Sequence, residues 1–367
     1  MNDSKCRFGI LSAAQIARKN WHAIRSSGCA IVKGVSSRDP ARTAAFIEDC
    51  QYEAPFQVEP TIYSSHEELL ASDEIDAVYI PLPTGLRKEW VIKAAEAKKH
   101  VLVEKPVASD ASDVEEMIAA CESNDVLLMD GVMFDHSQRI SAICDQVNAG
   151  ELGKLRRIQT HFSFCGDTEF QSSNIRTDPV LERHGCLGDL GWYCIRFILW
   201  IRDFEVPSRV SGRTVTPIHR ESSNAWVPGQ FAAEFEFADG VTAGFFCSFM
   251  SANQQTALVS GEAGYLSVDD FVLPLYDSQT NWKINRHELS IQGGYWNFKR
   301  RSDAFSCDEF HSGEAKSQEV QMIRTFVETA SVNYPDRRFA ERALKTQQVL
   351  DALRVSDDQS GSWIEMR

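Results

Sequence analysis

The stretch Lys99-His-Val-Leu-Val-Glu-Lys-Pro106 decides the fold of this chain. Residues 101–103 are an apolar run, which is typical of a strand buried on both faces of a parallel sheet. Pro106 cannot continue a strand ladder, so the carboxyl end of this strand opens into a loop. Because ligands of open α/β sheets bind at that edge, Lys105 is a candidate for proton transfer, with Glu104 beside it to orient its charge. Taken alone, these two residues fit a surface ion pair before a turn equally well.

The segments on both sides of this strand alternate between strand and helix patterns over the first 135 residues. Strands are expected at 7–11, 31–36, 77–82, 101–104 and 126–129, and helices at 16–26, 41–49, 86–98 and 112–122. This alternation predicts an α/β domain with a doubly wound parallel sheet of Rossmann type and right-handed crossovers.

After residue 135 the pattern changes to long alternating segments. Strands are expected at 155–164, 209–218, 231–237, 241–249, 256–260 and 265–268, and helices at 137–149, 189–200, 318–331 and 338–355. The turn Ala238-Asp-Gly240 is a strong hairpin signal. We therefore predict a domain at 1–135 and a second, α+β domain at 136–367 around a mostly antiparallel open sheet. The last helix is a candidate to pack back on the first domain.

Composition narrows the class of protein. The chain has 367 residues, with 38 basic and 52 acidic side chains and a net charge of −14, which argues against nucleic acid or an anionic membrane as the main partner. Its 10 cysteines show no metal-type spacing and are expected to be reduced core residues, so no metal site is predicted. No apolar run approaches the length that spans a membrane, and the first expected strand leaves no room for a leader peptide, so a cytoplasmic location is expected.

The first strand runs into Gly9-Ile-Leu-Ser-Ala-Ala-Gln-Ile-Ala17, where a dinucleotide-binding protein has a glycine-rich turn. Ser12, Ala14 and Ala17 stand at the three glycine positions. All three are small, so the helix amides can still face a pyrophosphate. The replacement of glycine is least favourable in the tight turn at Ser12, which must avoid a backbone conformation that only glycine tolerates. An ordinary strand–helix junction is the alternative. The cofactor-binding residues predicted here are Gly9, Ser12, Ala13, Ala14, Gln15 and Ile16.

The end of the second strand reads Gly34-Val-Ser-Ser-Arg-Asp39. An acid directly at the strand tip would bind the ribose hydroxyls of NAD, whereas a hydroxyl and a guanidinium suit the additional phosphate of NADP. Ser37 and Arg38 come before Asp39, so NADP(H) is favoured over NAD(H). The alternative is a solvated turn ahead of the next helix.

These features, together with Pro81-Leu-Pro-Thr84 and Glu104-Lys-Pro106, resemble the Gfo/Idh/MocA oxidoreductase family. The resemblance covers nearly the whole chain and is strongest to the branch with dimeric dihydrodiol dehydrogenase and its plant relatives. Further matching blocks are Glu74-Ile-Asp-Ala-Val-Tyr-Ile-Pro81, Met129-Asp-Gly-Val-Met133, Gly185-Cys-Leu-Gly-Asp-Leu-Gly-Trp-Tyr193 and Gly261-Glu-Ala-Gly-Tyr-Leu266.

The resemblance implies a Rossmann domain followed by a domain whose open sheet covers the nicotinamide and mediates dimerisation. The family's catalytic groups map on Lys105, Asp189 and Tyr193. The spacing of i and i+4 places Asp189 and Tyr193 on one face of a helix. The alternative for this pair is a core tyrosine with Asp189 capping the helix.

The resemblance also places residues near the cofactor and shows one departure. The cofactor neighbours it implies are Pro81, Leu82, Pro83, Leu86, Arg87, Glu104 and Lys105. Arg87 stands where the family commonly has a histidine. It is interpreted as a cation near the cofactor phosphates or the substrate, or as a solvated helix residue.

The predicted reaction is hydride transfer between nicotinamide C4 and a secondary alcohol or ketone of a sugar, sugar-like, alicyclic or diol substrate. Tyr193 moves the hydroxyl proton and Lys105 stabilises the oxyanion, although the two roles can be exchanged. The substrate-site candidates are Phe164, Arg176, Trp192 and Met133, with Phe162, Asp167 and His136 near them, and His136 alternatively caps the following helix. The predicted partners are a small-molecule substrate and a second copy bound through the second-domain sheet. The alternatives are a catalytically silent nucleotide- or sugar-binding protein and an enzyme with a closed redox cycle, such as an epimerase.

Overall fold

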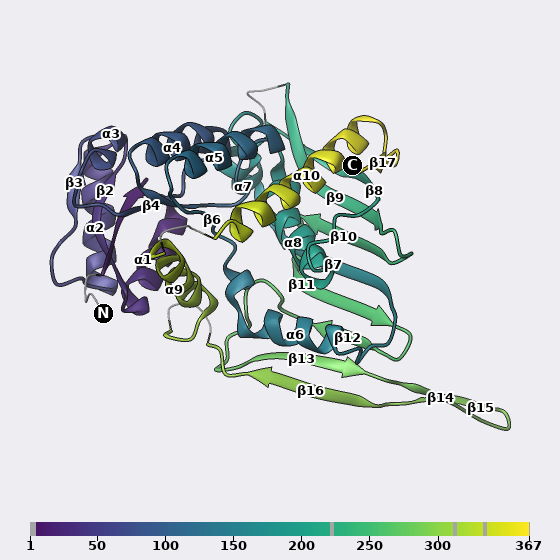
Figure 1. Ribbon diagram of the computed structural model, residues 1–367. Coiled ribbons are helices and arrows are strands. Elements are labelled where there is room, and N and C mark those ends of the chain that lie inside the picture. Colours follow the sequence, from purple (N-terminus) through teal and green to yellow (C-terminus); the bar gives the residue numbers. More distant parts are fainter. Residues whose placement is uncertain (1–4, 221–223, 311–313, 333–335, 367) are drawn as a thin grey trace. The chain divides into compact units, whose positions relative to one another are not determined.

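The computed structural model describes residues 5–220, 224–310, 314–332 and 336–366 (Figure 1). They form two compact units. Unit 1 comprises Met1–His136, Val180–Glu182 and His311–Gln347, and unit 2 comprises Ser137–Pro179, Arg183–Phe310 and Gln348–Arg367.

Unit 1 is built on a parallel sheet whose described strands follow the order β3-β2-β1-β4-β5-β6. The strands are β1 (Cys6–Leu11), β2 (Ala30–Ser36), β3 (Thr61–Tyr63), β4 (Ala77–Ile80), β5 (His100–Val103) and β6 (Leu128–Asp130). The helices are α1 (Gln15–Ser27), α2 (Pro40–Glu53), α3 (His66–Leu70), α4 (Thr84–Glu96), α5 (Ala111–Ser123) and α9 (Gln318–Ala330). This strand order is that of a doubly wound Rossmann sheet, so the predicted fold class is confirmed.

The central strands are apolar because both of their faces are covered. Every residue of β4 is buried, and so are residues 101–103 of β5. The strand expected at 77–82 ends at Ile80, because Pro81 follows and cannot donate to the ladder. The short elements β3 and α3 were not predicted, since three to five residues are too few for a clear periodicity.

After the sheet of unit 2 the chain returns to unit 1, where it forms α9. Phe326 packs on Phe8 of β1 with ring centroids 5.2 Å apart, and Glu319 forms an ion pair of 2.5 Å with Lys19 of α1. The next helix, α10 (Arg338–Asp358), begins in unit 1 and ends in unit 2.

Unit 2 is built on a mixed sheet whose described strands follow the order β16-β13-β12-β11-β7-β10-β9-β8-β17. Only β7 and β10 pair in parallel among these strands, which confirms the predicted mostly antiparallel sheet. The strands are β7 (Leu155–Cys165), β8 (Arg209–His219), β9 (Trp226–Glu236), β10 (Thr242–Ser248), β11 (Met250–Gly261), β12 (Tyr265–Val268), β13 (Thr280–Asn285), β16 (Ser302–Cys307) and β17 (Ile364–Glu365). The helices are α6 (Gln138–Asn148), α7 (Thr168–Ser173) and α8 (Trp192–Ile201).

The two faces of this sheet differ. On one face α8 covers β7 and β10, and α6 lies against β16. The end of α10 covers β8, where the Ser356 hydroxyl accepts a hydrogen bond of 2.9 Å from the backbone N–H of Gly212. On the opposite face Gln159 and Leu258 are exposed on the two adjoining strands β7 and β11. We call this second face the open face.

A two-stranded hairpin, β14 (Glu288–Gln292) and β15 (Tyr295–Lys299), extends from β13 and β16 beyond the sheet (Figure 1). None of these four strands was predicted, because β14, β15 and β16 are mostly exposed and mix apolar, polar and charged side chains, and the buried residues of β13 include polar ones. The turn Gly293-Gly294 was the signal that could have identified the hairpin.

Two general expectations concern the whole chain. None of the 10 cysteines, all within the described residues, forms a disulfide, and five of them are buried, although Cys165 is exposed. Among the described residues no helix is long and apolar enough to cross a membrane.

Candidate functional site

The loop after β5 is fixed by a buried polar network. Glu104 is buried, and its Oε1 accepts hydrogen bonds from the Tyr79 hydroxyl at 2.5 Å and from Asn20 Nδ2 at 3.4 Å. Asn20 Nδ2 also donates to the Tyr79 hydroxyl at 2.7 Å. The second carboxylate oxygen of Glu104 accepts from the backbone N–H of Lys105 at 3.3 Å. Glu104 therefore anchors the backbone of the predicted catalytic lysine to the centre of the sheet.

Tyr79 is held as the neutral donor of this network. Complete burial, followed by the charge of Glu104 and its hydrogen bond, raises the pKa of Tyr79 well above its ordinary value. The phenol therefore keeps its proton at physiological pH and donates a hydrogen bond to Glu104. Gly131 lies next to this carboxylate, and a Cβ at that position would meet Glu104 Oε1 at 3.2 Å.

Arg87 differs from one of the two interpretations made from the sequence. Its side chain is only 5% exposed, so it is not a solvated helix residue. Its Nε donates to the carbonyl of Leu82 at 2.7 Å and its Nη1 donates to the carbonyl of Pro106. The guanidinium therefore bridges the loop after β4 and the loop after β5, and the role of its charge near the cofactor or the substrate stays a prediction. A buried arginine that bonds to backbone leaves no signal in the sequence.

The turn between β1 and α1 also differs from its prediction. Ser12 has a φ of 147°, so it adopts the glycine-like conformation that it was expected to avoid. Gly9 lies inside β1, where a Cβ would collide with the side chain of Leu69, so Gly9 allows α3 to approach the sheet closely. Ala14 precedes α1 without a side-chain cap on the helix amides. The small residues of this turn and the uncapped amides of α1 fit the pyrophosphate of a dinucleotide.

The loop after β2 and the first turn of α2 carry two arginines, Arg38 and Arg42, close to a residue that caps this helix. Asp39 caps α2, and its Oδ1 accepts from the backbone N–H groups of Ala41 at 2.9 Å and Arg42 at 3.3 Å. The Ser37 hydroxyl donates to the carbonyl of Asp39 at 2.9 Å, and Arg38 is exposed. Arg42 was not predicted, although its Nη2 lies 3.5 Å from the carbonyl of Ala13 in the β1–α1 turn. Because Asp39 is committed to the helix cap, this edge suits a phosphate better than it suits ribose hydroxyls.

The loop after β4 is bound by a segment that lies far away in the sequence. Thr84 donates to Glu182 from its backbone N–H at 2.9 Å and from its hydroxyl at 2.6 Å. The N–H of Gly85 donates to the carbonyl of Leu181 at 3.0 Å. Glu182 thus caps α4, whose preceding residue Pro83 offers no side-chain cap. Sequence reasoning missed Glu182, because nothing local connects two residues that are 98 positions apart.

Two of the predicted cofactor neighbours lie near the start of α4. Leu86 bonds through its N–H to the carbonyl of Pro83 at 2.9 Å and is 37% exposed. Pro81 is buried at the end of β4.

In unit 2, Asp189 lies in a π-helical turn, Leu187–Gly191, and Tyr193 lies in α8. The regular α-helix expected across 189–200 is therefore wrong at its start. Asp189 does not cap a helix with its side chain, and its Oδ2 forms an ion pair of 3.0 Å with Nε of the exposed Arg176. Tyr193 is buried, and its ring makes an edge contact with Phe162, with centroids 5.7 Å apart. The structure thus brings Asp189 and Arg176 together in unit 2.

The other predicted substrate residues have mainly packing roles. Trp192 is completely buried, so it belongs to the core of unit 2, and its Nε1 has no hydrogen-bond partner among the described residues. Phe164 packs its ring on Phe170 at 5.1 Å and is half-buried. Asp167 caps α7 by accepting from the backbone N–H of Phe170 at 2.7 Å.

The two candidates in unit 1 lie in the turn Met133–His136. Met133 is buried, and His136 stacks on Phe339 with ring centroids 5.8 Å apart. The cap of α6 is Ser137, which accepts from the N–H of Arg139 at 3.1 Å, so the alternative role of His136 as that cap is wrong.

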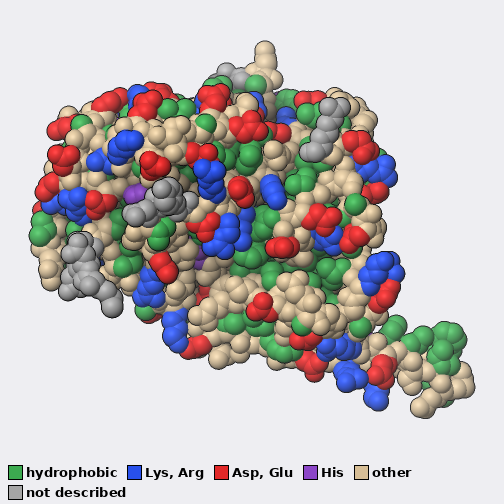
Figure 2. All heavy atoms as spheres, viewed as in Figure 1, with side chains coloured by type: hydrophobic (Ala, Val, Ile, Leu, Met, Phe, Trp, Pro, Cys, Tyr) green, Lys and Arg blue, Asp and Glu red, His purple; other side chains and the backbone are tan. Residues whose placement is uncertain are grey.

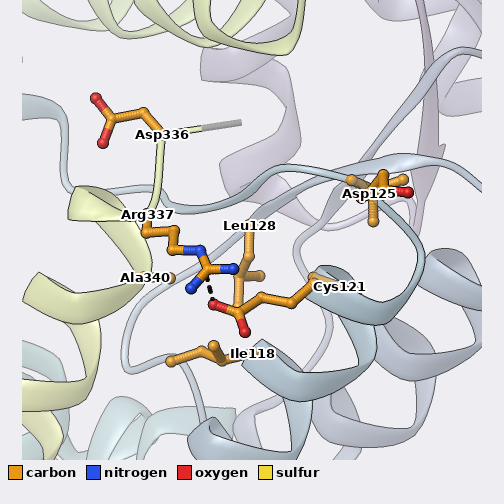
Figure 3. A pocket seen from close by; sticks show the side chains of 9 residues that line it. Ile118, Cys121, Asp125, Leu128, Asp336, Arg337 and Ala340 are labelled. Atoms are coloured by element: carbon orange, nitrogen blue, oxygen red, sulfur yellow. Dashed lines mark ion pairs between the residues drawn. The ribbon is translucent and has the colours of Figure 1, made fainter. Parts of the chain in front are cut away.

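A pocket in unit 1, between α5 and the first turn of α10 (Figure 3), is lined by none of the candidate site residues. Arg337 crosses it to form an ion pair of 3.1 Å with Glu122. The described residues include no cluster of three or more His, Cys, Asp or Glu side chains that could hold a metal ion.

Comparisons with known proteins connect this geometry with oxidoreductases. A family model described as an oxidoreductase family with an NAD-binding Rossmann fold matches residues 6–132, and a model of the GFO/IDH/MocA C-terminal domain matches residues 140–267. D-xylose 1-dehydrogenase (NADP(+)) 2 of Haloferax volcanii is 31% identical over 71% of this chain and 75% of its own length. Trans-1,2-dihydrobenzene-1,2-diol dehydrogenase of Mus musculus is 30% identical over 73% of this chain and 76% of its own.

Further similarities are more limited. A dTDP-3,4-didehydro-2,6-dideoxy-alpha-D-glucose 3-reductase of Saccharopolyspora spinosa is 34% identical, and the match spans about half of each protein, 52% of this chain and 54% of the reductase. The solved structure of a 3-ketoreductase from Actinomadura kijaniata in complex with NADP and TDP-benzene superimposes with a TM-score of 0.77 at 22% identity, over 96% of this chain and 98% of that one. At this identity the structural match establishes the fold.

Proposed function

Because this chain belongs to the Gfo/Idh/MocA oxidoreductase family, we propose that it is an NADP(H)-dependent oxidoreductase acting on a secondary alcohol or ketone. The proposed substrate is a sugar, a sugar-like compound, an alicyclic ketone or a diol. The observation that carries the proposal is the buried network of Asn20, Tyr79 and Glu104, which fixes the Lys105 loop at the ligand-binding edge of a Rossmann sheet.

The residues of unit 1 fit NADP(H). The uncapped N-terminus of α1 would hold the pyrophosphate, and Ser37, Arg38 and Arg42 would hold the phosphate that distinguishes NADP from NAD. When bound, the cofactor supplies the carbon that gives or accepts the hydride. The relatives whose names or structures include NADP support this choice.

The chain's own residues would handle the proton and the charge on the substrate oxygen. In the reductive direction Tyr193 gives its phenolic proton to that oxygen, while the Lys105 ammonium stabilises the negative charge that develops on it. In the oxidative direction the proton returns to Tyr193. Asp189 has a positioning role through its ion pair with Arg176, and Arg176 is the candidate to bind an anionic or polar group of the substrate. The two roles of Lys105 and Tyr193 can be exchanged.

We infer that unit 1 is the cofactor domain and unit 2 the substrate domain. A homodimer through the open face and a cytoplasmic location complete the proposal. The absence of disulfides among the 10 cysteines supports a reducing compartment.

The test is a substrate screen with the purified protein. Binding of NADPH and NADH is followed by cofactor fluorescence, and ketoses, sugar-derived ketones, diols and alicyclic ketones are then supplied with each cofactor. We expect consumption of NADPH in proportion to product, at a higher kcat/KM than with NADH. Binding without turnover on any substrate would favour the catalytically silent alternative. Substrate conversion without net consumption of NADP(H) would favour a closed redox cycle.

The residue test is Lys105→Met, which removes the charge and keeps most of the side-chain volume. We expect a loss of at least about a thousandfold in kcat, with NADPH binding largely intact. The matched control is Lys98→Met, because Lys98 is exposed and precedes β5 at the end opposite to Lys105. Turnover by Lys105→Met close to that of the control would remove Lys105 from the chemistry.

A further inference from the structure

The strands β13 to β16 form a β-ribbon in two paired segments, which are separated by residues 286–287 and 300–301 outside the strands. Its pairs run from Thr280 opposite Cys307 to Gln292 opposite Tyr295 without any shift of register between the inner and outer parts. The backbone hydrogen bond from Arg286 N–H to the carbonyl of Arg301, 2.9 Å long, joins the two parts. The ribbon closes on Gly293-Gly294, where Gly293 has a φ of 59°, as a tight hairpin turn requires. We call β14, β15 and this turn the ribbon arm.

The ribbon arm has one apolar face. Leu289 is paired with Phe298, and Ile291 is paired with Trp296, so these four side chains lie on the same side of the arm. They are exposed by 50% (Leu289), 72% (Phe298), 53% (Ile291) and 68% (Trp296). The other face carries Glu288, Ser290, Gln292, Tyr295, Asn297 and Lys299. Figure 2 shows hydrophobic side chains gathered on the projecting arm, with basic side chains near its base.

An apolar face of this kind is expected to be covered by a binding partner and not to remain exposed to solvent. A two-stranded hairpin is marginally stable by itself, because it has no second layer to bury its apolar side chains. Contiguous exposed apolar patches on a folded protein commonly mark an interaction site. The arm therefore requires an occupant for its apolar face.

The position of the apolar face in the register identifies the side on which that occupant binds. In β13, Trp282 lies on the helix-covered face, where its Nε1 donates to Gln146 of α6 at 2.7 Å. Lys283 therefore lies on the open face, because successive side chains in a strand alternate. With no shift of register, Leu289 and Ile291 lie on the same side as Lys283. The apolar face of the arm is thus continuous with the open face of the sheet.

A second contact supports this continuity at the base of the arm. Tyr265 of β12 faces away from Leu266, which is buried on the helix-covered face. The Tyr265 ring makes an edge contact with His287, with centroids 5.9 Å apart. His287 precedes the arm and shares the side of Leu289. The open face and the apolar face therefore meet at this pair.

The open face itself is flat and mixed in character. His161 packs on Phe246 with ring centroids 5.1 Å apart, and Leu258 on β11 is 39% exposed. Arg157 donates two hydrogen bonds to the carboxylate of Glu234, at 2.5 and 2.8 Å. The pair lies over Gly244, which has no side chain and so leaves room for it. Because Arg157 and Glu234 are already paired, covering them would leave neither of these two charges unpaired.

We propose that the ribbon arm of one copy lies across the open face of a second copy, and that the reverse contact forms at the same time. A twofold axis makes this arrangement self-complementary, because each chain contributes both an arm and an open face. An aromatic side chain buries roughly 150–250 Å² when it is covered, so Trp296 and Phe298 of the two arms would contribute several hundred Å² toward an interface of about 1,200–2,000 Å². The ribbon follows residue 267, where the family-model matches end, so neither model covers it.

The distribution of side chains argues against a membrane as the occupant. The apolar residues lie along one side of the arm, while its tip is Gly293-Gly294 and has no apolar anchor. The chain carries a net charge of −14, which disfavours an anionic lipid surface. The inference deepens the dimer that belongs to the proposed function, and it does not depend on the reaction.

The test is the mass of the full chain in solution, measured by light scattering and sedimentation over a range of concentrations. We expect the wild type to be a dimer and the double variant Trp296→Ser, Phe298→Ser to have a dissociation constant raised by about 100-fold or more. The matched control is Asn297→Ser, which changes the opposite face of the same strand and should leave the dissociation constant unchanged. A second variant, Leu258→Asp, changes the open face and should weaken the dimer in the same way.

Several outcomes would overturn this arrangement. A monomeric wild type, or a double variant that dimerises as tightly as the control, would exclude the arm as a dimer contact. Loss of dimerisation in the arm variant but not in Leu258→Asp would exclude the open face as its receptor. Binding of the wild type, but not of the double variant, to phosphatidylcholine–phosphatidylserine vesicles would identify a membrane as the occupant. Because mass is measured without substrate, failure here is distinguishable from failure of the proposed reaction.

Discussion

In unit 1 the loop that carries Lys105 is held by buried polar groups, whereas in unit 2 the ring of Tyr193 packs on Phe162 and the nearby Asp189 forms an ion pair with an exposed arginine. The Lys105 loop depends on Tyr79, Glu104 and Arg87, whose polar atoms are bonded inside the protein. Buried hydrogen bonds fix direction and are costly to leave unmade, whereas ring packing tolerates the loss of a polar atom that does not take part in it. The two segments should therefore respond differently to substitution.

The largest effect on kcat is expected from a substitution that removes the reacting hydroxyl and keeps the packing of its ring. In Tyr193→Phe the ring stays against Phe162 and only the hydroxyl is lost. We expect kcat to fall by about 10²–10⁴, whereas the free energy of unfolding should fall by no more than the roughly 1–2 kcal/mol of one hydroxyl hydrogen bond. Steady-state kinetics and urea unfolding measure the two effects, and Tyr276→Phe, at an exposed position in the same unit, is the control. If kcat falls by less than a factor of three, Tyr193 does not transfer the proton.

The next largest effect is a loss of stability when buried hydrogen bonds in unit 1 are removed. Arg87→Met keeps an apolar side chain of suitable length but leaves the carbonyl oxygens of Leu82 and Pro106 without their donor. We expect a loss of about 2–3 kcal/mol in the free energy of unfolding, together with a lower kcat because the Lys105 loop shifts. Urea unfolding measures the first quantity.

The control for Arg87 is its neighbour in the helix. Lys88 forms ion pairs at the surface with Asp113 and Glu116, so Lys88→Met should cost much less stability than Arg87→Met. Arg87→Lys should recover only part of the loss, since a lysine cannot reproduce the fork of a guanidinium. Equal stability of Arg87→Met and Lys88→Met would show that Arg87 does not hold the two loops.

These differences also explain which features the sequence could predict. The parallel sheet and the Glu104-Lys105 loop were predictable because buried strands leave apolar runs and Pro106 ends one of them. The role of Arg87 was not, because the same helix pattern is compatible with an exposed or a buried side chain. Glu182 caps α4 from a segment 98 residues away, and such a contact has no local signature. In unit 2 the π-helical turn at Asp189 escaped prediction, since it changes the hydrogen bonding within an apolar helix but not its composition.

A smaller effect is expected from the phenol that holds Glu104. Tyr79→Phe removes one donor to a buried carboxylate and should cost about 1–2 kcal/mol in the free energy of unfolding. The pH dependence gives a second measurement. Burial and the charge of Glu104 raise the pKa of Tyr79, so the unfolded chain loses the phenolic proton first as the pH rises. The wild type should therefore keep this contribution below about pH 10 and lose stability above it.

In Tyr79→Phe this alkaline loss should be reduced, because the group that causes it is absent. The measurement is urea unfolding of both proteins between pH 7 and the onset of global alkaline unfolding. Tyr52→Phe is the control, since Tyr52 is 91% exposed and its removal should leave the alkaline slope unchanged. The same slope in all three proteins would mean that Tyr79 titrates alike in the folded and unfolded chain.

The smallest effect concerns the turn between β1 and α1 in unit 1. There the backbone of one residue has an unfavourable conformation that neither buried hydrogen bonds nor ring packing removes. Ser12 has a φ of 147°, a conformation that costs a residue with a Cβ about 1–3 kcal/mol and costs glycine little. Because glycine also loses more entropy on folding, we expect Ser12→Gly to stabilise the protein by about 1 kcal/mol net and to preserve NADPH binding. Ala45→Gly, at an exposed position inside α2, should instead destabilise by about 0.5–1 kcal/mol. If both glycine variants lose stability alike, the turn before α1 is not strained, and the serine at that position has no backbone cost to explain.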